Sequence, residues 1–149
     1  MAISPIAPVY NRADITFERG EGAYLYDIKG ERYLDFLAGI AVNSLGHAHP
    51  HMIDALTKQA KKIWHVSNIF YTEELRKFSN RLVEASFADT VFFCNSGTEA
   101  TEAGIKAVRK YFDENGEPEK YRIITFEGAF HGRTFGAIAA TGTPKVLEG

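Results

Sequence analysis

A short apolar run that leads directly into a helical pattern constrains the fold of this chain more than any other feature. The run extends from Thr90 to Cys94, and its length and continuity are typical of a strand buried on both faces of a parallel sheet. A helix is expected over residues 96–112, and residues 122–126 form the next predicted strand. Strand, helix and strand in one sheet imply a right-handed parallel crossover, so the sequence predicts the α/β fold class.

Residues 1–49 are predicted to form a small N-terminal segment with a β-hairpin. Two runs rich in aromatic and branched side chains, residues 23–28 and 32–36, flank a turn that contains Gly30. Glycine is suited to such a turn because it adopts positive φ without steric cost. Residues 39–50 are then expected to form a loop.

The helical pattern begins at Pro50, a residue well placed in the first turn of a helix. Apolar residues recur at three- and four-residue spacing after it, and a second amphipathic helix is expected after Thr72, whose side chain can cap it. Residues 50–149 are therefore assigned to the start of a larger domain built on the parallel sheet.

Composition places the chain among ordinary globular proteins. Hydrophobic residues make up 45% of the sequence and the net charge is −2, so neither a disordered tail nor a nucleic-acid surface is expected. Cys94 is the single cysteine, which excludes an internal disulfide framework and suits a buried strand position. Because the chain lacks an apolar window of membrane-spanning length and a leader-like start, we expect a soluble, cytoplasmic protein.

The junction between the predicted strand and the next helix has the features of an anion site. The helix starts within two residues of Asn95, so unpaired N–H groups collect at the carboxyl end of the strand. Ser96 and Glu99 form a capping box, Gly97 lets an anion approach the backbone, and Thr98 offers a hydroxyl. The alternative is an ordinary capped helix. Nucleoside-triphosphate and dinucleotide motifs are absent from the sequence, so a monophosphate fits better.

A second candidate region follows the second predicted strand and should reach the same edge of the sheet. Phe130 is flanked by glycines and could lay its ring on a planar heteroaromatic cofactor, while the guanidinium of Arg133 suits a substrate carboxylate. Taken singly, Phe130 is more typical of a core residue and Arg133 of a solvated surface charge. Together with the anion site at residues 95–99, they indicate an amino-acid enzyme with a flat, phosphorylated cofactor.

Four separated motifs, in the order and at the spacing of one family, carry a resemblance over nearly the whole chain. Residues 95–103 and 126–134 resemble the class III, or ornithine-type, pyridoxal-phosphate aminotransferases. Residues 41–50 and 67–72 are most similar to the acetylornithine aminotransferases within that class. The resemblance implies the N-terminal part of the fold-type I pyridoxal-phosphate transferases, which are aspartate-aminotransferase-like.

The resemblance also implies roles for individual residues. Ser96, Gly97 and Thr98 would hold the phosphate of pyridoxal 5'-phosphate, Phe130 would stack on its ring, and Arg133 would bind the substrate α-carboxylate. The implied reaction moves the terminal amine of N-acetylornithine to 2-oxoglutarate, which becomes glutamate, in arginine biosynthesis. The family forms homodimers with each active site at the subunit interface.

Ile40 bears on the choice of substrate. Ornithine aminotransferases have a tyrosine near the substrate amine where this chain has Ile40, and an apolar residue there would tolerate an acetylated nitrogen. This difference favours N-acetylornithine, while ornithine, succinylornithine and 4-aminobutyrate remain alternative substrates within the same class.

The resemblance leaves the catalytic residue outside this chain. No lysine here stands in the sequence context of the family's Schiff-base lysine, which is expected beyond residue 149, so the chain alone is expected to be inactive.

Three other interpretations stay open. A metal site is conceivable at His47, His49 and His51, although we expect no metal, because cysteine and carboxylate ligands are not nearby in the sequence. A non-catalytic dimerisation fragment and the related aminomutase branch are the remaining alternatives.

Overall fold

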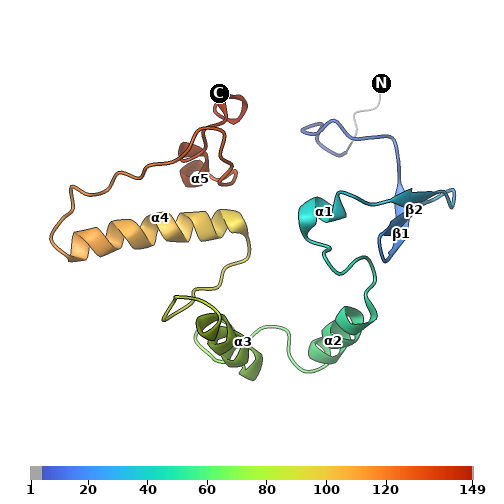
Figure 1. The fold of residues 1–149 in the computed structure, drawn as a ribbon, viewed down its shortest axis with the longest axis horizontal. Helices are drawn as coiled ribbons and strands as arrows, with labels where there is room; N and C mark the ends of the chain where they lie inside the picture. Colours follow the sequence, from blue (N-terminus) through green and yellow to red (C-terminus); the bar gives the residue numbers. More distant parts are fainter. Residues whose placement is uncertain (1–4, 149) are drawn as a thin grey trace. The chain divides into compact units, whose positions relative to one another are not determined.

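The computed structural model of the protein describes residues 5–148, which divide after Tyr71 into two units (Figure 1). The first unit contains three strands and two helices: β1 (Phe17–Glu21), β2 (Tyr24–Asp27), β3 (Arg32–Leu34), α1 (Ala38–Ala41) and α2 (Pro50–Ala60). The second unit is helical: α3 (Glu73–Glu84), α4 (Gly97–Glu114), α5 (Phe135–Ala139) and the 3₁₀ turn η1 (Pro144–Val146).

The sheet of the first unit is antiparallel, with strand order β1-β2-β3. The hairpin predicted around Gly30 is confirmed as β2 and β3, and Gly30 has a φ of 83°. Asp27 holds this turn, since its buried carboxylate accepts the N–H groups of Lys29 and Glu31 at 2.9 and 2.8 Å. β1 was not predicted, because its sequence has charged residues and a glycine in place of alternating apolar ones.

The segment expected to be a loop contains a left-handed turn, α1. Four successive residues have positive φ: Ala38, Gly39, Ile40 and Ala41, at 45°, 63°, 63° and 64°. This conformation costs energy for every residue except glycine, so the surrounding contacts must maintain it.

Asp35 supplies those contacts from one side of the turn. One of its carboxylate oxygens accepts the N–H groups of Leu37 and Ala38 at 3.0 and 2.9 Å, and the other lies 2.7 Å from Nε2 of His47. The backbone of His47 in turn pairs with that of Gly22. The bond from His47 and the backbone N–H groups lower the pKa of Asp35.

This lowered pKa predicts a specific pH dependence. The carboxylate contributes stability that is fully present above its ordinary pKa of 3.8 and is lost as pH falls through the lower folded-state pKa. The difference in urea-unfolding free energy between the whole protein and its Asp35→Asn variant should therefore shrink as pH is lowered through and below 3.8. Asp54→Asn, which alters an exposed carboxylate paired with Lys58, serves as the control. An Asp35→Asn difference that does not vary with pH would contradict the prediction.

The predicted helices are confirmed, and α3 and α4 have the expected side-chain capping contacts. α2 begins at Pro50, and α3 begins after Thr72, whose hydroxyl accepts the N–H of Leu75 at 3.2 Å. α4 starts within one residue of the predicted position and ends two residues later than expected, before Gly116, which has a φ of 75°.

The two predicted strands of the second unit are absent. Residues 90–94 and 122–126 form no strand in the described part of the chain, and they do not pair with each other. A strand needs the backbone of a neighbour to complete its ladder, and residues 5–148 offer neither segment such a neighbour. A single parallel bridge between Glu127 and Gly142 follows the second segment. Similar solved structures, described below, support the fold class itself.

Most large apolar side chains of the described residues are exposed. Within residues 5–148, Ala137 is the one buried apolar residue, whereas Phe92, Ile124 and Phe126 are 77%, 94% and 83% exposed. Cys94, predicted to be buried, is exposed as well. The apolar runs at residues 90–94 and 122–126 therefore have the composition of buried core strands, but no core surrounds them in the described residues. None of the described helices combines the length and apolar character needed to cross a bilayer.

Candidate functional site

The N-terminal turn of α4 has the predicted capping box. The hydroxyl oxygen of Ser96 accepts the N–H of Glu99 at 3.2 Å, and the Glu99 carboxylate accepts the N–H groups of Asn95 and Ser96 at 2.5 and 3.1 Å. These bonds fix the junction that precedes the helix.

The capping box leaves two donors at this turn. Within the described residues, no acceptor takes the N–H groups of Gly97 and Thr98, the first two residues of α4. A Cβ built on Gly97 would have no neighbouring atom within 4 Å, so open space adjoins these donors. Two adjacent N–H groups without an acceptor, next to open space at the positive end of an 18-residue helix, suit an anion of phosphate size.

The loop that carries Phe130 and Arg133 packs against the same turn. Gly132 is buried with a φ of 134°, and a Cβ at this position would lie 2.8 Å from Cβ of Thr98. Only glycine accommodates both the backbone angle and this approach. The structure therefore brings the two separately predicted regions, the α4 turn and the 130–133 loop, into direct contact.

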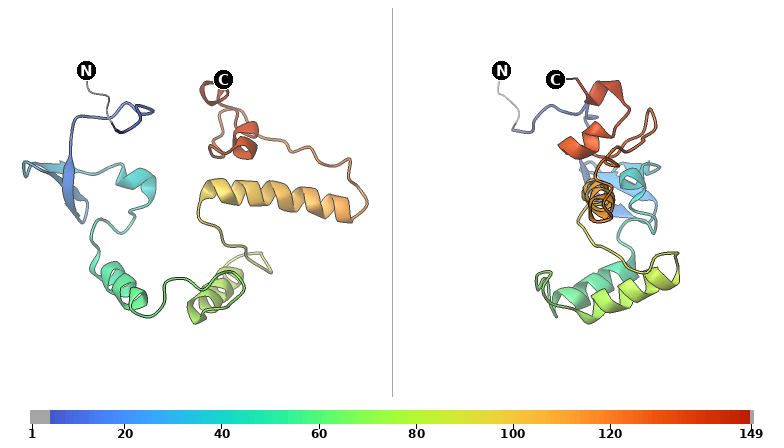
Figure 2. Two further views of the ribbon diagram at one scale, coloured as in Figure 1. Left: turned by 180° about the vertical axis from the view of Figure 1, so that it is seen from behind. Right: turned by 90° about the vertical axis from the view of Figure 1, so that its left-hand side faces the viewer.

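Two further residues of α4 fasten the loop. The hydroxyl of Thr101 donates to the carbonyl oxygen of His131 at 3.0 Å. The Glu102 carboxylate accepts the hydroxyl of Thr134 and, at 3.3 Å, the N–H of Ala137 in α5. α5 accordingly lies beside the N-terminal half of α4 (Figure 1 and the left view of Figure 2).

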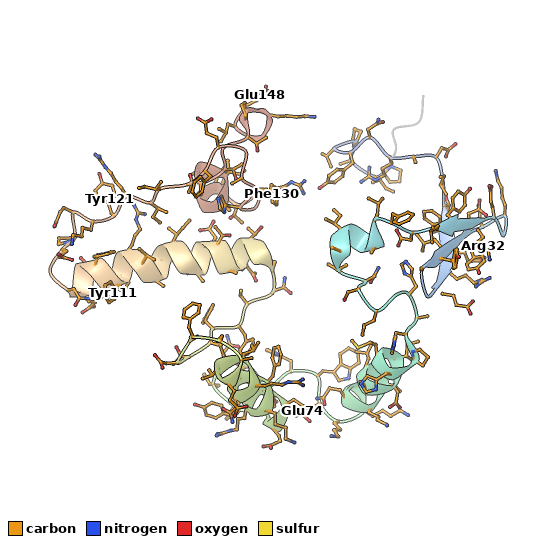
Figure 3. The ribbon with its side chains drawn as sticks, viewed as in Figure 1. Arg32, Glu74, Tyr111, Tyr121, Phe130 and Glu148 are labelled. Atoms are coloured by element: carbon orange, nitrogen blue, oxygen red, sulfur yellow. The ribbon has the colours of Figure 1, made fainter. Side chains whose placement is uncertain are left out.

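Phe130 and Arg133 lie close to each other on this loop. Cζ of Arg133 is 5.7 Å from the centroid of the Phe130 ring, within the range of a cation–π contact. The Phe130 ring is 62% exposed, which leaves a face available to a ligand. Figure 3 shows Phe130 toward the N-terminal end of α4, whereas Tyr111 and Tyr121 lie toward its C-terminal end.

Ile40 belongs to the other unit, where it occupies the left-handed turn α1 and is 88% exposed. Its backbone conformation, with a φ of 63°, is unusual for a branched residue. Such strain is typical of functional positions.

The three histidines of the alternative metal site do not act together. His47 contacts Asp35, His49 occupies the N-cap position of α2 without a side-chain capping bond, and His51 is exposed within that helix. Among residues 5–148, no group of three or more His, Cys, Asp or Glu side chains has the arrangement of a metal site.

Sequence reasoning missed the residues that hold the site in place. Thr101 and Glu102 follow the phosphate turn directly, but their partners lie 30 and 32 residues away. Asp35 and His47 are 12 residues apart. The glycines at 132 and 136 were the available signal, because each marks a point of close approach to α4.

The sequence matches the family described as "Aminotransferase class-III" over residues 6–149. A protein of Agrobacterium fabrum named acetylornithine aminotransferase is 58% identical over 148 residues, which cover 99% of this chain and 37% of that protein. A protein of the same name from Xanthomonas campestris is 50% identical over 95% of this chain and 35% of its own length. This chain thus spans just over a third of the length of these relatives.

The similar solved structures are aminotransferases as well. The N-acetylornithine aminotransferase of Stenotrophomonas maltophilia has a TM-score of 0.75 and 46% identity, over 81% of this chain and 34% of that protein. An (S)-enantioselective omega-transaminase from Thermomicrobium roseum has a TM-score of 0.90 and 30% identity, over 98% of this chain and 35% of that protein. The fold of this chain is therefore similar to that of transaminases.

Proposed function

We propose, because this chain belongs to the class-III aminotransferases, that the whole protein containing it moves the terminal amine of N-acetylornithine to 2-oxoglutarate. The chain has the N-terminal part of the fold of the fold-type I transferases. Enzymes of this family use pyridoxal 5'-phosphate as their cofactor. The observation that carries the proposal is the contact between the α4 turn and the loop of Phe130 and Arg133.

The α4 turn fits the phosphate of this cofactor. The N–H groups of Gly97 and Thr98 and the hydroxyls of Ser96 and Thr98 are donors on one short stretch, and open space adjoins Gly97. The dianionic phosphate accepts several hydrogen bonds and is favoured by the helix dipole. The capping role of Ser96 uses a lone pair of its hydroxyl oxygen, so its hydrogen stays available for donation.

The loop beside this turn supplies the other two contacts. Phe130 presents an exposed ring that would stack on a planar pyridine, and Arg133 presents a guanidinium that would bind a carboxylate in a bidentate pair. The cofactor, when bound, provides the electron sink for amino transfer. The contribution of these residues is to hold the cofactor and to orient the substrate by its carboxylate.

Arginine biosynthesis, N-acetylornithine as donor and 2-oxoglutarate as acceptor are proposed from the names of the relatives and from Ile40. The relatives at 50% to 58% identity are named acetylornithine aminotransferases. Ile40 offers an apolar surface, which suits an acetylated nitrogen better than a charged ammonium. A homodimer with active sites at the subunit interface and a cytoplasmic location are part of the same proposal, supported by membership of the family.

The proposal is tested with purified whole protein, 2-oxoglutarate and a panel of amine donors. N-acetylornithine should give the highest kcat/KM for glutamate formation, and ornithine should be lower by roughly tenfold or more, because a site shaped for a neutral amide disfavours a charged amine. Succinylornithine and 4-aminobutyrate complete the panel. Preference for ornithine or 4-aminobutyrate would overturn the substrate assignment, and absence of glutamate with every donor would overturn the aminotransferase assignment.

A further inference from the structure

The carboxylate of Glu102 connects α4 to the C-terminal end of the loop that carries Phe130 and Arg133. It contacts neither the N-terminal turn of α4 nor Phe130. Glu102 accepts the hydroxyl of Thr134, the residue before α5, and the N–H of Ala137 within the first turn of α5. The first N–H groups of any helix lack intrahelical partners. Glu102 therefore caps α5 from a different helix, a role that the side chain of Thr134 does not fill for its own helix.

The approach of α5 to Glu102 depends on Gly136. A Cβ at this position would lie 2.8 Å from Oε1 of Glu102 and closer still to Oε2, so a larger residue would displace the Glu102 carboxylate from the N-terminus of α5. The hydroxyl of Thr134 and the backbone N–H groups of Ala137 and Gly136 lower the pKa of Glu102. The carboxylate thus remains charged at neutral pH, which strengthens its bonds to these donors.

Glu102 is one of three residues on a single face of α4 that contact the loop. Thr101 and Glu102 follow Thr98 by three and four residues, so both lie next to Thr98 on the same face of the helix. Thr98 packs on Gly132, and Thr101 binds the carbonyl oxygen of His131. The chain is therefore bonded to α4 on both sides of Arg133, through His131 on its N-terminal side and through Thr134 on its C-terminal side.

We infer that Glu102 and Thr134 are positioning residues, which set the place of Arg133 relative to the phosphate turn by fixing the backbone on its C-terminal side. The inference rests on the proposed function, because it assigns to this pair the orientation of the substrate carboxylate. Neither side chain needs to contact the substrate, since a displaced guanidinium alone weakens substrate binding and alignment.

The test uses the whole protein with bound cofactor and the variants Thr134→Ala, Thr134→Ser and Glu102→Gln. Thr134→Ala should raise KM for the amine donor roughly tenfold while changing cofactor affinity by less than about twofold. Thr134→Ser, which keeps the hydroxyl, should restore the KM of the unmodified protein. Glu102→Gln, which removes the charge, should behave like Thr134→Ala. Glu114→Gln, in which an exposed carboxylate paired with Lys110 is altered on the same helix, should leave KM unchanged.

A second measurement separates positioning from general stability. The dissociation constant of glutarate, a dicarboxylate that cannot react, is read from the change in cofactor absorbance. It should rise with KM in Thr134→Ala and return in Thr134→Ser. Equal KM and glutarate affinity in Thr134→Ala and the unmodified protein would overturn the inference, and so would an equal loss in the alanine and serine variants. Failure of the proposed function is a different result, because the unmodified protein would then form no glutamate.

Discussion

Replacing Arg133 with alanine in the whole protein is expected to raise KM for N-acetylornithine and for 2-oxoglutarate by roughly thirtyfold. That factor corresponds to about 2 kcal/mol, the lower end of the cost of truncating one partner of a hydrogen-bonded charge pair. The lower end is chosen because the guanidinium is exposed in the described residues. Cofactor affinity should change little, because the phosphate donors and Phe130 remain.

Two further variants sharpen this prediction. Arg133→Lys keeps the charge but loses the planar fork, so its KM should lie between those of the unmodified protein and the alanine variant. Arg109→Ala is a matched control, since Arg109 is also exposed and its guanidinium lies 5.7 Å from an aromatic ring, that of Tyr121. Steady-state kinetics with both substrates provides the measurement. Equal KM values in Arg133→Ala and Arg109→Ala would remove Arg133 from the substrate site.

The sequence predicted the helices well because their limits are set by local chemistry. Pro50, the Thr72 cap and the Ser96 capping box each lie within a few residues of the helix that they start. Gly116 marks the end of α4 in the same way. Such signals can be recognised without knowledge of the tertiary structure.

The predicted strands show the limit of the same reasoning. The apolar runs at residues 90–94 and 122–126 indicate which residues prefer a buried strand. A strand also requires a neighbouring strand in the sheet. β1 illustrates the opposite case, because the polar sequence Phe17–Glu21 forms a strand when β2 lies beside it. Pairing decides both outcomes, and pairing is not visible in a local pattern.

The residues of the candidate site were predicted from the sequence, whereas the contacts that support them were not. Gly97, Thr98, Phe130 and Arg133 were proposed from residue type and spacing, and their roles stay predictions. The bonds from Thr101 and Glu102 join segments about 30 residues apart, and no periodicity connects those positions. The strained backbone at Ile40 was equally hidden, since positive φ at a branched residue contradicts its local preference.

The first N–H groups of α4 are central to the proposed function, because they are proposed to bind the cofactor phosphate. Gly97 allows a direct test, because it is the first residue of the helix. Proline is well tolerated at that position, yet it has no N–H to donate. The preceding Ser96 has φ −150° and ψ 163°, an extended conformation of the kind favoured before proline. Gly97→Ala is the matched control, since it retains the N–H and its Cβ meets no protein atom within 4 Å.

The decisive measurement is the affinity of the whole protein for pyridoxal 5'-phosphate and for pyridoxal, which lacks the phosphate, in these two variants. A hydrogen bond to a charged group contributes about 1.5 to 3 kcal/mol, so Gly97→Pro should bind pyridoxal 5'-phosphate at least roughly tenfold more weakly than Gly97→Ala. The two variants should bind pyridoxal equally. Equal affinity of both variants for pyridoxal 5'-phosphate, or an equal loss of both ligands in Gly97→Pro, would contradict the assignment of this turn to the cofactor phosphate.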